Sequence, residues 1–127
     1  MTKPTYTTEY KAIEQVLLNE YSEGGKQAKS EIMQPAFHEV ATMYSVGENG
    51  AIAGGSVTES LFPVIDNHFT PSENPTVAIA YIDITGNAAS ARVDTDNLSG
   101  YGFTDYFNLL KINGKWQIVS KIFHAHY

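Results

Sequence analysis

The closing stretch of the chain, residues 101–127, constrains the fold more than any other part. It reads YGFTDYFNLLKINGKWQIVSKIFHAHY, two runs that alternate apolar and polar residues on either side of Asn113-Gly114. An Asn-Gly pair between two such runs favours the tight turn of a β-hairpin, because these residues tolerate positive φ. The pattern therefore predicts two long antiparallel strands joined at this turn.

A two-residue turn also predicts which residues of the two strands face each other. With Ile112 opposite Lys115, Asp105 lies opposite Ile122 and Phe103 opposite His124. The more apolar face, which we expect to face the core, carries Phe103, Asp105, Phe107, Leu109, Trp116, Ile118, Ser120, Ile122 and His124. The other face carries Thr104, Tyr106, Asn108, Leu110, Gln117, Val119, Lys121 and Phe123. A β-bulge would overturn this assignment, because it moves every later side chain to the opposite face.

The first part of the chain predicts helices. An apolar stripe predicts a helix from about Glu9 to Ser22, capped by Thr7 or Thr8 and ended by the glycines of EGGK. Residues 30–38 predict a short second helix, and Pro35 implies that it is kinked or begins late.

A small hairpin with Asn49-Gly50 in its turn is expected next. Ser56 and Glu59 then predict a capping box at the start of a third helix, which Pro63 should bend.

Residues 76–96 alternate around Gly86-Asn87 and predict a further long hairpin. Tyr81 and Arg92 should lie opposite each other on its outer face. Its inner face should leave space for a cavity beneath the sheet, because it carries the mostly small residues Ala80, Ile82, Ile84, Ala89, Ala91 and Val93. Three helices followed by about four long antiparallel strands predict an α+β fold in one domain, residues 1–127, with the helices on one face of a curved sheet.

Composition excludes several classes of function. A net charge of −6 with only eight Lys and Arg argues against binding nucleic acid or an anionic membrane. The absence of Cys excludes disulfides, thiol nucleophiles and thiolate metal sites. No apolar run suggests a membrane span or a signal peptide, so the expected location is cytoplasmic. The four His form no pair on a well-predicted element and no phosphate-binding loop is present, so neither a metal nor a cofactor is expected.

Three motifs carry a resemblance to a known family. FTDYFNLLKINGKWQIVSKIFH, YSEGG at residues 21–25 and AFH at residues 36–38 resemble the lumazine-binding-like family of the nuclear transport factor 2-like superfamily, which also holds SnoaL-like polyketide cyclases and ketosteroid isomerases. The resemblance implies a cone-shaped curved sheet around about three helices, a pocket at the wide end, and homodimers. Two positions depart from the family pattern: the early acidic residue is delayed to Glu31, and Glu39 replaces a Pro. No motif matches the catalytic residues of ketosteroid isomerases.

Asp105 is the first candidate for chemistry. A carboxylate between apolar walls has a raised pKa and can act as general acid or base. The alternative is a structural Asp that accepts hydrogen bonds from backbone N–H groups or a Tyr. His124 completes a possible catalytic dyad with Asp105, unless it is only a strand-end His bonded to a carbonyl or water.

The expected ligand-binding set consists of side chains that could line a pocket for a flat ligand: His38, Tyr44, Tyr101, Phe103, Ser120 and Trp116. His38 serves equally well as a packing or capping residue, and aromatic residues in a small domain are usually core.

Three classes of function remain. The sequence favours a module that binds a flat or hydrophobic small molecule. The alternative is a cofactor-free isomerase, cyclase or dehydratase that uses Asp105 as general acid or base, which requires a pocket reaching Asp105 and a perturbed pKa there. A purely structural role is the third. A homodimer is expected through the outer sheet face, where Tyr106, Leu110, Val119 and Phe123 lie among Asn108, Gln117 and Lys121.

Overall fold

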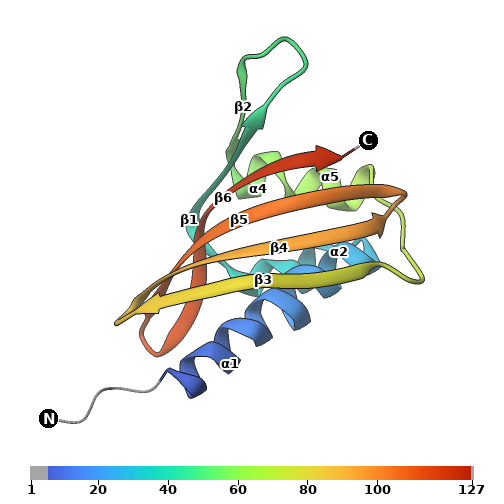
Figure 1. The fold of residues 1–127 in the computed structure, drawn as a ribbon. Helices are drawn as coiled ribbons and strands as arrows, with labels where there is room; N and C mark the ends of the chain where they lie inside the picture. Colours follow the sequence, from blue (N-terminus) through green and yellow to red (C-terminus); the bar gives the residue numbers. More distant parts are fainter. Residues whose placement is uncertain (1–5, 127) are drawn as a thin grey trace, which may run out of the picture.

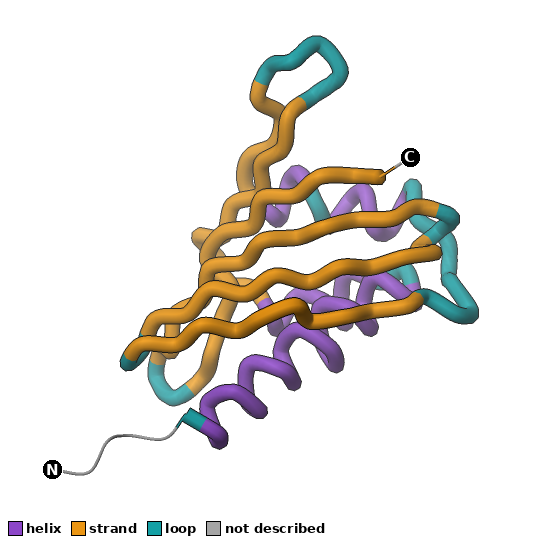
Figure 2. The backbone as a smooth tube through the Cα atoms, viewed as in Figure 1, coloured by secondary structure: helices purple, strands orange, loops and turns teal. Residues whose placement is uncertain are grey.

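The computed structural model describes residues 6–126 as a strongly curved sheet with helices on its concave side (Figures 1 and 2). The sheet has six strands in the order β2-β1-β6-β5-β4-β3. All neighbours are antiparallel except β1 and β6, which run parallel. The predicted α+β fold with a curved sheet around helices is confirmed.

The first helix is longer than expected. It runs without a break through α1 (Thr7–Gln15), a π-helical segment η1 (Val16–Ser22) and α2 (Glu23–Gln27). Tyr6 precedes it without a side-chain cap bond, so the predicted Thr cap is wrong. The prediction that the glycines end the helix is also wrong.

Gly24 has a packing role instead. The helix ends at Ala28, which takes the left-handed conformation (φ 56°). A Cβ at Gly24 would lie 2.6 Å from the Cβ of Met33 and 2.8 Å from its backbone nitrogen. The absence of a side chain at Gly24 therefore lets α2 approach α3 (Ser30–Met33) closely.

The second predicted helix is shorter than expected, because α3 and the 3₁₀ turn η2 (Gln34–Ala36) end before the strand β1 (Phe37–Val46). Phe37 and His38 thus belong to a strand. β1 and β2 (Ile52–Ser56) form the predicted small hairpin, which projects beyond the rest of the sheet (Figures 1 and 2).

The third helix begins and bends as predicted. Ser56 Oγ accepts a hydrogen bond of 3.2 Å from the Glu59 backbone N–H at the start of α4 (Val57–Ser60). The chain then breaks at Leu61, and Pro63 stands in the first turn of α5 (Phe62–Asn67).

Four long strands complete the sheet: β3 (Thr76–Thr85), β4 (Ala88–Leu98), β5 (Tyr101–Ile112) and β6 (Lys115–His126). Tyr81 lies opposite Arg92, as predicted. The register of β3 shifts between Ile79 and Tyr81. Ile79 therefore packs against the core and Ala80 is exposed, so the prediction for Ala80 is wrong.

A second irregularity changes the predicted faces of the last hairpin. Leu109 faces Ile118 as expected, but Asn108 faces Ser120, which leaves Val119 as an extra residue in β6. Beyond this bulge, every side chain of β6 lies on the face opposite to the predicted one. Lys121 and Phe123 consequently point inward, whereas Ser120, Ile122 and His124 point outward.

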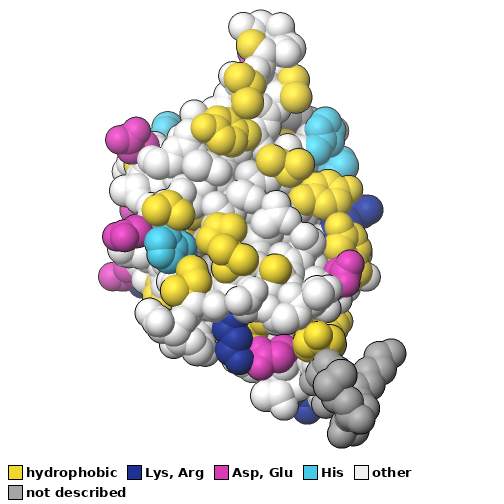
Figure 3. All heavy atoms as spheres, turned by 90° about the vertical axis from the view of Figure 1, so that its left-hand side faces the viewer, with side chains coloured by type: hydrophobic (Ala, Val, Ile, Leu, Met, Phe, Trp, Pro, Cys, Tyr) yellow, Lys and Arg dark blue, Asp and Glu magenta, His cyan; other side chains and the backbone are white. Residues whose placement is uncertain are grey.

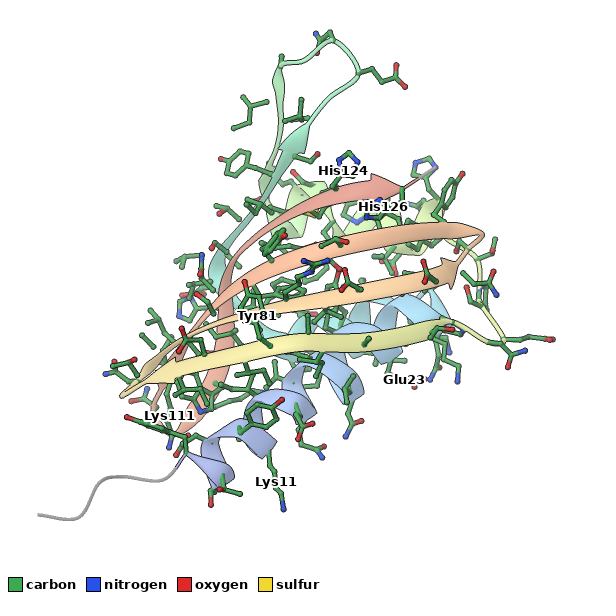
Figure 4. The ribbon with its side chains drawn as sticks, viewed as in Figure 1. Lys11, Glu23, Tyr81, Lys111, His124 and His126 are labelled. Carbon is green, nitrogen blue, oxygen red and sulfur yellow. The ribbon has the colours of Figure 1, made fainter. Side chains whose placement is uncertain are left out.

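The end of the sheet at the turn between β5 and β6, called the closed end below, is bonded to the start of α1. Glu9 Oε1 accepts from Lys111 Nζ at 2.7 Å, and Glu9 Oε2 accepts from the indole N–H of Trp116 at 2.6 Å. Figure 4 shows Lys111 at this end of the sheet. The hydrophobic core consists of fully buried side chains, chiefly Ile13, Leu17, Met33, Val93, Phe107, Leu109, Trp116 and Ile118. Within residues 6–126, no helix is long and apolar enough to cross a membrane.

Candidate functional site

Asp105 lies on the concave face of β5 and is only 2% exposed, so the prediction that it faces the core is confirmed. Its neighbours across the sheet are Val93 on β4 and Phe123 on β6. One carboxylate oxygen, Oδ2, accepts a hydrogen bond of 3.0 Å from the Tyr21 hydroxyl. The other, Oδ1, lies 3.4 Å from Lys121 Nζ. The three side chains form a buried polar cluster beneath the sheet.

Lys121 reaches this cluster because of the bulge at Val119. The residue is 5% exposed, and its Nζ lies 5.1 Å from the centre of the Tyr21 ring and 4.8 Å from that of Phe123. Aromatic faces attract a cation at such distances. The amine is therefore held between two rings and one carboxylate.

Tyr21 enters the cluster from the π-helical segment η1. Its ring packs edge-on against Phe107, with the centroids 4.8 Å apart, and against Phe37. π-helical turns are rare and occur frequently at functional sites, because they rotate side chains relative to a regular helix. Here the segment brings both Tyr21 and Ser22 to the space beneath the sheet.

The surroundings oppose charge on all three groups. Burial raises the pKa of Asp105, and the nearby Lys121 and Tyr21 only partly offset this effect. Burial lowers the pKa of Lys121, against the attraction of Asp105. Burial and the carboxylate of Asp105 raise the pKa of Tyr21 well above its usual range, so its hydroxyl stays protonated as a donor. Asp105 and Lys121 thus shift in opposite directions, both toward the neutral form.

Two buried oxygens of this region have no hydrogen-bond partner among residues 6–126. They are Asp105 Oδ1 and Ser22 Oγ, and both residues line the same hollow. Buried polar atoms are nearly always hydrogen-bonded in native proteins. Asp105 Oδ1 has only its ion pair with Lys121 Nζ, and Ser22 Oγ has no hydrogen bond within residues 6–126. A polar group of a bound molecule would therefore be stabilised at this position.

Two adjoining hollows lie between the sheet and the helices. The inner one contains about 40 Å³ of space for the centre of a water molecule, and Asp105 and Tyr21 line it together with Thr95. The outer one is much larger, about 590 Å³, and extends under β1 and β2. Both are bounded by Leu61, Phe69, Phe103 and Lys121. The inner hollow holds only the small end of a ligand, because one water occupies roughly 10–15 Å³ on this measure.

Aromatic side chains form the wall shared by the two hollows. Phe69 and Phe103 are stacked with centroids 5.9 Å apart and planes 22° from parallel. Phe123 contacts Phe103 edge-on at 6.2 Å, and Tyr101 lines the outer hollow. Such a wall suits a flat or hydrophobic molecule.

His124 and Ser120 lie outside the site, contrary to expectation. His124 faces Thr104 on the convex side, beside His126, with ring centroids 5.1 Å apart (Figure 4). Ser120 accepts a hydrogen bond from Asn108 on that side. The predicted dyad of Asp105 and His124 therefore does not form, because the bulge at Val119 turns these two side chains outward.

The other predicted ligand contacts are dispersed. Tyr44 lines a groove on the convex face, and Trp116 is buried at the closed end against Glu9. His38 Nδ1 accepts from the Val40 backbone N–H, and His38 borders a separate hollow beside Phe62. Of the six predicted contacts, the structure brings only Tyr101 and Phe103 to the two central hollows.

Sequence reasoning missed Tyr21, Lys121 and Phe69 as site residues. One signal was available for Lys121: a carboxylate on the apolar face requires a cationic or hydrogen-bonding partner, and Lys121 is on the strand that pairs with that of Asp105. Among residues 6–126, no group of three His, Asp or Glu is arranged to hold a metal ion.

Comparison with known proteins places the chain in a family. It is 32% identical to Aldolase FrzH from Cladobotryum sp. over 84% of this chain and 83% of that protein. An NTF2-like protein of unknown function from Shewanella baltica is 54% identical and superposes with a TM-score of 0.94, covering 98% of this chain and 99% of the other. A second one, from Methylobacillus flagellatus, is 33% identical with a TM-score of 0.87 and covers 100% and 99%.

The family described as "Putative lumazine-binding" matches residues 8–124, nearly the whole chain. The resemblance stated from the three sequence motifs is therefore confirmed. The protein belongs to this family, within the nuclear transport factor 2-like superfamily.

Proposed function

We propose that the protein is a cofactor-free enzyme that moves a proton on the carbon next to a carbonyl group of a small, largely apolar substrate. Asp105 is the base. The observation that carries the proposal is the buried carboxylate of Asp105, a residue that lines the inner hollow. Its Oδ1 has no hydrogen-bond partner among residues 6–126 and lies 3.4 Å from Lys121 Nζ. A general base must be within reach of the proton that it takes, and it works best when its pKa lies near the working pH.

The geometry favours an enzyme over a module that only binds. A binding module requires the hollows and their aromatic wall, but it does not require a carboxylate with a raised pKa inside them. Asp105 lines the inner hollow, and burial raises its pKa. Perturbed carboxylates in concave sites are typical of catalytic groups.

The cluster divides into three roles. Asp105 takes the proton from carbon, and Tyr21 holds the carboxylate in position through its hydroxyl. Lys121, on the other side of the carboxylate, polarises the substrate carbonyl. The apolar part of the substrate lies against Phe69 and Phe103 in the outer hollow.

The curated relative supports this reaction class. The protein from Cladobotryum is named an aldolase. An aldol reaction begins with loss of a proton from the carbon beside a carbonyl, which is the step proposed for Asp105.

The test is deuterium exchange of a model ketone. With 2-tetralone in D₂O, we expect the protein to accelerate exchange of the α-protons above the buffer rate, followed by NMR. Asp105→Asn should lower this acceleration roughly 100-fold or more. Asp83→Asn, which changes an exposed Asp of β3, is the matched control and should leave it unchanged.

The pH profile gives a second readout of the same experiment. Only the deprotonated carboxylate accepts a proton, so the rate should rise as the pH increases through the elevated pKa of Asp105. Exchange at the buffer rate, or equal acceleration by Asp105→Asn, would show that Asp105 is not the base and leave the binding function.

We further propose that the convex face of the sheet packs against a second copy of the chain. Side chains between 36% and 56% exposed gather there, namely Tyr44, Tyr81, Tyr106, Leu110 and Ile122. Phe123 and Lys121 point inward, so the prediction that they belong to this outer face is wrong. Val119 is the extra residue of the bulge. An isologous dimer pairs one such patch with itself, as the family resemblance implies.

A further inference from the structure

We infer that Lys121 is a Schiff-base lysine whose amine condenses with the carbonyl carbon of an aldehyde or ketone substrate in the hollows. The inference rests on the proposed function and deepens it, because it specifies how Lys121 acts on the carbonyl group. The alternative for Lys121 is a purely electrostatic role, in which its ammonium group donates a hydrogen bond to the carbonyl oxygen.

The position of Lys121 distinguishes it from the other lysines. It is the single lysine between residues 6 and 126 with a buried side chain, and it borders both hollows. The remaining lysines in that range are half-buried or exposed: Lys11, Lys26, Lys29, Lys111 and Lys115. A substrate in the outer hollow with its carbonyl end toward Asp105 would thus meet the amine of Lys121.

The surroundings of Lys121 favour the neutral amine, which is the nucleophilic form. The rings of Tyr21 and Phe123 flank Nζ, and burial lowers the pKa of the amine. Desolvation in an apolar pocket is a recognised way to activate a lysine for Schiff-base chemistry. The same burial weakens Lys121 as a permanent cation, which is what a purely electrostatic role requires.

The proposed step requires only the carbonyl substrate, the neutral amine of Lys121 and one proton from Asp105. The Nζ lone pair forms a bond to the carbonyl carbon, the π electrons move to oxygen, and a proton passes from nitrogen to oxygen to give a carbinolamine. The protonated carboxyl group of Asp105, whose pKa is raised by burial, gives that oxygen a second proton. The oxygen then leaves as water, the nitrogen lone pair forms the C=N bond of an iminium ion, and Asp105 remains as the carboxylate. Neither an oxidant nor a reductant is required.

Asp105 is placed for the next step. The α-carbon of the iminium ion is two bonds from Nζ, and Asp105 Oδ1 lies 3.4 Å from Nζ. The carboxylate can therefore take an α-proton, and the C–H electrons form the C=C bond of an enamine while the C=N π electrons return to nitrogen. Before this transfer, the carboxylate also balances the charge of the iminium ion, which forms at the position of Nζ.

The experiment traps the imine on the intact protein with 2-tetralone and sodium cyanoborohydride near neutral pH, followed by peptide mapping. We expect reduced adduct at Lys121 in at least tenfold excess over any exposed lysine. Lys121→Arg keeps a cation but cannot form an imine, so it should lose both the adduct and the deuterium exchange. Lys11→Arg, which changes an exposed lysine, should keep both.

The outcomes separate this inference from the proposed function. If Lys121 remains unlabelled while deuterium exchange still depends on Asp105, the Schiff-base role is overturned and the proton-transfer function stands. Full exchange activity in Lys121→Arg leads to the same conclusion. If wild-type protein shows neither exchange nor adduct, both proposals are overturned. Because trapping is done on the wild-type chain, a misfolded variant cannot hide the result.

Discussion

Lys121 and Asp105 place two ionisable groups where little water reaches them, 5% and 2% exposed. Removing such groups from water costs several kcal/mol each, and their attraction repays this cost only with good geometry. Their contact of 3.4 Å leaves Oδ1 without a hydrogen bond from any residue between 6 and 126. The pair therefore contributes little net stability, as expected for two groups whose proposed role is catalytic.

Stability measurements on single and double variants check this argument. Lys121→Met should lower the free energy of unfolding by about 3–5 kcal/mol, because it leaves the Asp105 carboxyl buried without its cation. Adding Asp105→Asn removes that unpaired charge, so the double variant should be no less stable than Lys121→Met alone. Urea denaturation at neutral pH gives the unfolding free energies of wild type, Lys121→Met, Asp105→Asn and the double variant.

Lys111→Met is the matched control for this cycle. Lys111 also pairs with a carboxylate, that of Glu9, but both side chains are partly exposed and Glu9 keeps its bond to Trp116. Its loss should cost much less stability than the loss of Lys121, because exposed ion pairs contribute little. Additive losses in the double variant of Lys121 and Asp105 would show that the two residues do not act as a pair.

The sequence predicted one half of this cluster and missed the other. The bulge lies in β6 and not in β5, the strand of Asp105. Alternation along β5 alone therefore placed Asp105 correctly on the inner face. The identity of its partner depended on β6, where one extra residue exchanged His124 for Lys121. A bulge changes few local contacts and leaves no reliable composition signal, so register counted from a turn loses its value beyond it.

Among the elements, the continuous first helix shows how glycine can be misread. Gly24-Gly25 predicted a helix end, since glycine accepts left-handed dihedrals there. In the structure both residues are helical and buried, and Ala28 takes the left-handed position. The competing reason for glycine, close contact between backbones, depends on which helix lies opposite, and that information is tertiary.

Alanine substitutions at the two glycines separate these effects. Alanine favours a helix over glycine by about 1 kcal/mol. At Gly24 the new Cβ would lie 2.6 Å from Met33 Cβ and 2.8 Å from its backbone nitrogen, so Gly24→Ala should lower the unfolding free energy by about 1–3 kcal/mol. The clash cannot be relieved by a flexible side chain, because part of it involves the backbone of α3.

Gly25→Ala is the neighbouring control. Its Cβ would meet Leu98 Cδ2 at 3.4 Å and Met33 Cε at 3.8 Å, distances close to ordinary contact. We expect unchanged or slightly higher stability, from the helix propensity of alanine. Thermal unfolding followed by circular dichroism measures both variants, and equal effects at the two positions would contradict a packing role for Gly24.

For the molecule as a whole, the fold was predictable and the site was not. Turn residues and alternation predicted the long hairpins, and the family motifs predicted the curved sheet around helices. The hollows depend on how η1, the segment that follows α5 and the bulged β6 meet. This packing brings together Tyr21, Phe69 and Lys121 from distant parts of the chain. Local sequence patterns do not predict how these three distant segments pack together.

Assembly is a further property of the whole molecule. The projecting hairpin carries Val46 and Ile52, 77% and 76% exposed, beside a groove that also contains Tyr44, Tyr106 and Ile122. Figure 3 shows hydrophobic side chains following this hairpin at the top of the molecule. Exposed apolar groups in one region are typical of an interface, and they are the basis of the proposed dimer.

Light scattering at micromolar concentration tests the dimer, with an expected mass of twice the 14.0 kDa of one chain. Ile122 is 56% exposed on the convex face and pairs with Tyr44 and Tyr106 on the neighbouring strands. Ile122→Glu should therefore convert the dimer to a monomer, because a buried, unpaired carboxylate opposes association. Leu18→Glu places the same charge on a residue of η1 that is 37% exposed, and this control should remain dimeric. A wild-type mass of one chain, or dissociation by Leu18→Glu alone, would remove the convex face as the interface.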